Sequence, residues 1–118
     1  MHRALYTEIL EDAPADARER ERQAIERSIE LLNGAKVSGV GSRKAVEALH
    51  YLDRLWSILL DDLANAENRL PKDLRANLIS IGIWILREIE ELRNNRTQSF
   101  KGLIDISEII CKGLGQRN

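Results

Sequence analysis

Apolar residues recur at helical spacing through most of the 118-residue chain, and this pattern restricts the fold more than any other feature. In the clearest stretch the apolar residues follow one another at steps of three or four: Ala45, Leu49, Leu52, Trp56, Leu59 and Leu63. A second stretch has similar steps: Leu74, Leu78, Ile81, Ile85, Ile89 and Leu92. Steps of three and four place side chains on one face of an α-helix. The sequence therefore predicts long amphipathic helices.

Residues that interrupt helices are scarce. The chain has two prolines and seven glycines, whereas a sheet protein of this size needs frequent turns. Pro14 and Pro71 suit first helical turns, Ser42 suits an N-cap, and Asn33-Gly34 suits a helix end. These signals predict four principal helices, near residues 14–33, 42–64, 71–94 and 98–114.

A short turn or helix over residues 4–10 precedes these four helices, and the glycine-rich residues 34–41 are predicted to form the main flexible connection. The length corresponds to one domain, over residues 1–118. We therefore expect an all-α, single-domain helical bundle.

The segment Leu78–Leu86 is apolar nearly all the way round the predicted third helix. It is too short to cross a bilayer and is flanked by charges, so membrane insertion is not expected. Such a segment is either buried on several sides or partly reserved for a partner. Gly82 within it costs about 1 kcal/mol relative to alanine, and close approach of another helix would explain it. A strand over this isoleucine-rich segment is the alternative.

Charge and rare residues exclude several functions. Eighteen basic against 19 acidic side chains give a net charge of -1, so nothing draws the whole chain to nucleic acid or to an anionic membrane. One cysteine, Cys111, and two histidines, His2 and His50, cannot build a disulfide or a structural zinc site. We find no nucleophile–base pattern, so no enzyme, metal or cofactor is predicted. The first residues lack a signal-peptide core, which favours a cytoplasmic protein.

Short stretches along almost the whole chain have a recognisable pattern, and the run Leu-Ile-Ser-Ile-Gly-Ile-Trp is the most specific of them. The matching stretches are Tyr6–Ile9, Ala17–Arg22, Leu55–Trp56, Asp62–Leu63, Asn68–Pro71, Leu74–Ala76, Leu78–Trp84 and Leu103–Ile106. Together they resemble the FlaF family of flagellar biosynthesis regulators of alphaproteobacteria. The resemblance implies a cytoplasmic, non-enzymatic positive regulator of flagellin synthesis and secretion, acting opposite the flagellin-mRNA regulator FlbT. Family members look like flagellin-binding export chaperones.

The termini of flagellin are amphipathic helices, and an apolar helical groove can hold such a helix. We therefore expect flagellin as the partner, with FlbT as a second candidate. The residues expected to bind it are Trp56, Leu78, Ile79, Ile83, Trp84 and Leu86. The alternative is that both tryptophans belong wholly to the core.

Two rival functions stay open. Direct or FlbT-mediated regulation of flagellin mRNA would use Arg43, Lys44, Arg54 and the charged strip Arg18–Arg22, although interleaved acids and the absence of exposed aromatic runs speak against nucleic acid. A homo-oligomeric module would instead use the surplus apolar face against its own copy.

Overall fold

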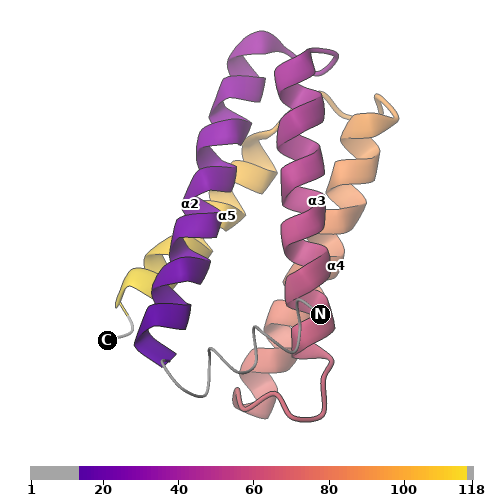
Figure 1. Ribbon diagram of the computed structural model, residues 1–118. Helices are drawn as coiled ribbons and strands as arrows, with labels where there is room; N and C mark the ends of the chain where they lie inside the picture. Colours follow the sequence, from indigo (N-terminus) through magenta and orange to yellow (C-terminus); the bar gives the residue numbers. More distant parts are fainter. Residues whose placement is uncertain (1–13, 117–118) are drawn as a thin grey trace.

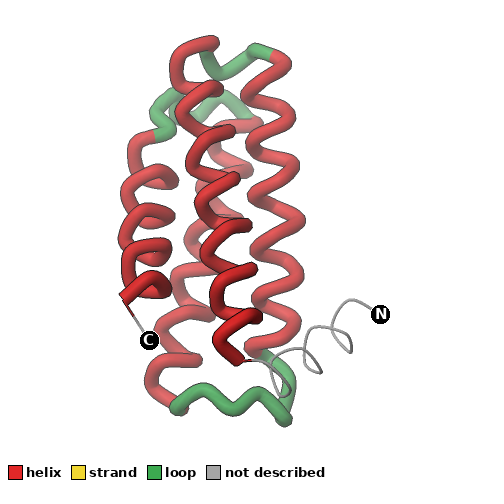
Figure 2. The backbone as a smooth tube through the Cα atoms, turned by 60° about the vertical axis from the view of Figure 1, so that its left-hand side comes forward, coloured by secondary structure: helices red, strands yellow, loops and turns green. Residues whose placement is uncertain are grey.

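A computed structural model describes residues 14–116, and within that range the chain forms helices and no strand. The helices are α2 (Pro14–Ser38), α3 (Arg43–Leu63), α4 (Lys72–Arg93) and α5 (Lys101–Gln116). They alternate in direction along one common axis (Figure 1), and the connecting loops gather at the two ends (Figure 2). The all-α prediction is confirmed, and the strand alternative for Leu78–Leu86 is wrong because this segment lies within α4. The element predicted over residues 4–10 lies outside the described residues.

The first helix is longer than predicted. It passes through Gly34 and ends at Ser38 instead of residue 33. Leu32 and Ala35 are fully buried, so packing of this turn outweighs the cost of about 1 kcal/mol for a glycine in a helix. The helix stops where Gly39 takes φ = +103°, which glycine adopts without steric cost. The predicted flexible connection 34–41 is therefore mostly helix.

The start of α3 follows the prediction. Ser42 is the N-cap, and its Oγ accepts a hydrogen bond of 3.1 Å from the backbone N–H of Ala45. This bond satisfies one of the N–H groups that a helix start leaves without an intrahelical partner.

Gly82 allows α3 and α4 to approach closely, as its position predicted. A Cβ at residue 82 would lie 2.7 Å from Cδ2 of Leu60 and 3.0 Å from Cε3 of Trp56. Both distances are shorter than ordinary carbon–carbon contacts. The glycine therefore makes room for the side chains of α3.

The helices form an open row rather than a closed ring. α2 packs against both α5 and α3, and α3 packs against α4, whereas no other pair of described helices has a comparable interface. α4 is consequently supported mainly by α3. Much of its apolar surface is left for side-chain contacts with α5, for solvent or for a partner.

Candidate partner-binding surface

Trp56 does not lie on the surface where we expected it. Its side chain is 2% exposed and packs against Gly82 within the core of the bundle. The cause is its place on the apolar face of α3, between the buried residues Leu52 and Leu63, which turns the ring toward α4. For this tryptophan the structure favours the core alternative.

The five candidates on α4 divide between different faces of that helix. Ile79, Ile83 and Leu86 follow each other at i, i+4 and i+7, so they form one stripe, which we call the outer stripe. Ile83 is 44% exposed, and the other two are partly exposed. Leu78 is also partly exposed but continues the core-facing side of α4, four residues before Gly82.

Trp84 points toward α5, about 100° round the helix from Ile83. Its side chain is 42% exposed, and a Cβ at Gly102 of α5 would lie only 3.0 Å from its Cη2 atom. The ring thus bridges α4 and α5 with one part while another part meets solvent. The core alternative, which treated both tryptophans alike, does not describe Trp84.

Among the described residues three other large apolar side chains are exposed, and none of them belongs to the predicted binding residues. Val37 is 88% exposed, Val46 64% and Ile109 65%. Ile109 lies seven residues after Gly102, so it shares the side of α5 that faces Trp84. The signal that could have identified Ile109 is its position outside the main apolar face of α5.

Glu21 is another residue that sequence reasoning missed. It lies four residues before Ile25 and seven before Ser28, both buried, so its side chain points to the interior of the bundle. Burial, which is the larger cause, and the charge of the Asp62 carboxylate together raise its pKa from 4.5 to about 7. Asp62 is itself buried near the end of α3, where its Oδ2 accepts a hydrogen bond of 3.2 Å from Asn68.

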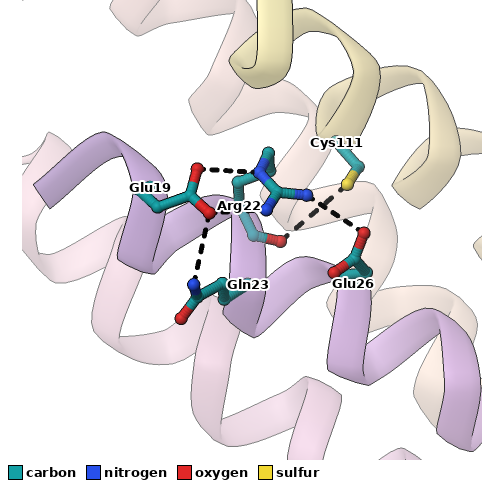
Figure 3. Close-up of polar contacts among 5 residues, drawn as sticks. All are labelled: Glu19, Arg22, Gln23, Glu26 and Cys111. Carbon is teal, nitrogen blue, oxygen red and sulfur yellow. Dashed lines mark hydrogen bonds and ion pairs between the residues drawn. The ribbon is translucent and has the colours of Figure 1, made fainter. Parts of the chain in front are cut away.

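The charged strip Arg18–Arg22 contains ion pairs within α2 (Figure 3). The Nε of Arg22 donates to Glu19 at 2.9 Å, and its Nη1 donates to Glu26 at 3.0 Å. The hydrogen bond from Arg22 holds the pKa of Glu19 below its ordinary value. This pairing is typical of a solvated helix surface and leaves Arg22 poorly placed to bind a phosphate.

Cys111 approaches the same helix from α5. Its thiol lies 3.8 Å from the carbonyl oxygen of Arg22 and donates to it, and the side chain is partly buried (Figure 3). The contact ties the C-terminal half of α5 to α2.

Two further findings concern the described residues alone. They contain no group of three or more His, Cys, Asp or Glu side chains that could hold a metal ion. None of their helices is long and apolar enough to span a membrane.

Comparison with known proteins gives one match. The model of the family described as flagellar protein FlaF matches residues 2–114. No curated protein and no solved structure matches the chain. Because the family match extends over nearly the whole sequence, this flagellar protein belongs to the FlaF family.

Proposed function

We propose that this protein is a non-enzymatic positive regulator of flagellin synthesis and secretion, and that it acts as a cytoplasmic export chaperone by binding flagellin on the apolar surface of α4. Membership of the FlaF family supports a flagellar role. The proposal that α4 binds flagellin rests on one observation: α4 packs mainly against α3 and exposes Ile83 and Trp84 near its middle.

The surface suits an amphipathic helix. The outer stripe Ile79, Ile83 and Leu86 presents apolar side chains at the spacing by which one helix packs against another. A helix laid along it would bury apolar area on both partners, which contributes about 25 cal/mol per Å². Flagellin termini must stay unpaired before export, so a chaperone that covers their apolar faces would both protect and deliver them.

Co-expression with flagellin from the flagellated host and purification through a tag on this protein test the proposal. Ile83→Glu places a charge on an exposed position of the outer stripe, so we expect flagellin capture to be lost while the far-UV circular dichroism stays helical. Val37→Glu is the matched control, because Val37 is 88% exposed and lies near the C-terminal end of α2. Equal capture by Ile83→Glu and the wild type would contradict the proposal.

The same purification separates the alternatives. Recovery of flagellin mRNA or FlbT without flagellin would favour post-transcriptional regulation. RNA binding through basic side chains would also weaken steeply as salt rises.

A further inference from the structure

The two halves of the bundle differ in how α4 and α5 are packed. At the end where α2 and α4 finish, side chains from all four helices are almost completely buried, among them Leu32, Leu49, Leu92 and Leu103. At the opposite end, the described part of α4 has no buried residue before Gly82, and that of α5 has none after Ser107. We call this second part, where α2 and α4 begin and α3 and α5 end, the open half (the lower part of Figure 1).

Apolar side chains occupy core positions in the open half without being buried. Ile81 lies four residues before the buried Ile85, and Ile110 lies three after the buried Ser107. Both are partly exposed, although they pack against the core cluster. The partly exposed apolar side chains at such positions, from three helices, are Leu59, Leu74, Leu78, Ile81, Ile110 and Leu114.

The open half lies where α4 and α5 have no extensive interface with each other. Trp84 touches Gly102 near the start of α5, and over their described length the backbones of α4 and α5 approach each other much less than those of α2 and α5 or of α3 and α4. The exposed Ile109 lies on the same side of α5 as Gly102. A further helix would therefore find apolar side chains from both α4 and α5.

The charged side chains of the open half indicate what kind of helix would bind there. Glu21 points inward from α2, in register with the buried Ile25 and Ser28, and the buried carboxylate of Asp62 near the end of α3 is close enough for its charge to raise the pKa of Glu21. Within the described residues Glu21 makes no hydrogen bond or ion pair, whereas the neighbouring Arg22 is held by Glu19 and Glu26. A partly buried carboxylate without a cation is costly, and a lysine or arginine brought by a partner would relieve that cost.

We infer that the open half binds an amphipathic helix that covers Ile81, Ile110 and Leu114 with its apolar side and places a lysine or arginine next to Glu21. This inference rests on the proposed function, because it takes flagellin as the partner and adds a second contact surface to the outer stripe. It also goes beyond it, since the open half is a different surface from the outer stripe and selects a basic side chain.

The other groups around Glu21 do not supply that charge. On α2, Arg22 is paired with Glu19 and Glu26, and Arg18, three residues before Glu21, already has an interaction of its own. Arg75 of α4 donates through Nε to the carbonyl oxygen of Leu63 at 3.1 Å, and Asn68 serves Asp62. On α5, the thiol of Cys111 contacts the backbone of Arg22, and the neighbouring Lys112 is exposed. Arg69, in the loop beside Asn68, already has an interaction of its own.

The test measures the affinity of purified monomeric flagellin for the full chain at about pH 6 and pH 8. A carboxyl whose pKa is about 7 is mostly protonated at the lower pH and mostly ionised at the higher, so the wild type should bind about tenfold more tightly at pH 8. Glu21→Gln should bind about as weakly at pH 8 as the wild type does at pH 6, with no pH dependence of its own. Glu30→Gln, on an exposed part of the same helix, is the control and should match the wild type.

Leu114→Gln tests the apolar contact separately and should weaken binding about fivefold at either pH, because it removes a partly exposed leucine near the end of α5. Flagellin that binds wild type and Glu21→Gln equally at both pH values would overturn this inference and leave the proposed function intact. No binding to any variant would overturn both. A concentration-dependent dimer of this protein that Leu114→Gln dissociates would also overturn it, because a second copy would then fill the open half.

Discussion

Glu21 makes the stability of this protein depend on pH in a direction opposite to that of most carboxylates. The folded state raises the pKa of this side chain from 4.5 to about 7, through burial first and the carboxylate of Asp62 second. A raised pKa means that the folded protein holds the proton more tightly than the unfolded chain does. The contribution of Glu21 to stability is therefore favourable below about pH 4.5 and is lost as pH rises through 7.

The size of the effect follows from the same values. The difference between 4.5 and about 7 corresponds to at most about 3 kcal/mol between the two protonation states. Glu21 is partly exposed, so solvent screening reduces the expected effect to about 1–2 kcal/mol. Glu21→Gln removes the charge, keeps the shape and abolishes this titration. At about pH 8.5 the variant should be more stable than the wild type by that amount, and at about pH 5 the advantage should shrink strongly.

Urea unfolding followed by far-UV circular dichroism at both pH values measures this difference directly. The two proteins share every other titrating group, so the comparison isolates Glu21. Glu30→Gln on the same helix is the matched control, and as an exposed substitution it should change stability by less than about 0.5 kcal/mol at either pH. A Glu21→Gln variant that is less stable than the wild type at pH 8.5, or that keeps the pH slope of the wild type, would refute the reasoning.

Two further predictions concern packing. Gly82→Val should lower the free energy of unfolding by about 1–3 kcal/mol, because a side chain there meets Leu60 and Trp56. Gly82→Ala should cost less, because alanine gains about 1 kcal/mol of helix propensity over glycine. Thermal unfolding of both variants checks this order, and equal midpoints would contradict the close approach of α3 and α4. Ser107 is 1% exposed, and its Oγ has no hydrogen-bond partner among the described residues. Ser107→Ala should therefore stabilise the protein by about 1 kcal/mol, as measured by urea unfolding. A clear loss of stability would show that the hydroxyl has a partner.

The helices could be predicted because the signals are local. The three-and-four spacing along α3, the N-cap at Ser42 and the glycine at position 82 each require only a few neighbouring residues to interpret. The end of α2 could not be predicted in the same way, since Gly34 reads locally as a stop. It is the burial of Ala35 against other helices that extends the helix to Ser38.

The candidate surface was predictable only as a segment of α4. The sequence shows that Leu78–Leu86 has more apolar residues than one helix face needs, but the side that meets α3 depends on tertiary packing. That packing buries Trp56, turns Trp84 to α5 and leaves Ile83 on the outer stripe. Glu21 was missed because it lies in a run of alternating acidic and basic residues, a pattern that is typical of a solvent-facing helix surface. Only its register with the buried Ile25 shows that its side chain faces inward.

We propose above that flagellin binds an apolar surface of α4. Calorimetric titration of purified monomeric flagellin into this protein tests it most directly, with Ile83→Glu and Val37→Glu measured beside the wild type. We expect saturable binding to the wild type and to Val37→Glu, and a loss of at least about tenfold in affinity for a correctly folded Ile83→Glu. Folded wild-type protein that gives no binding, or Ile83→Glu that binds as tightly as the wild type, would contradict it.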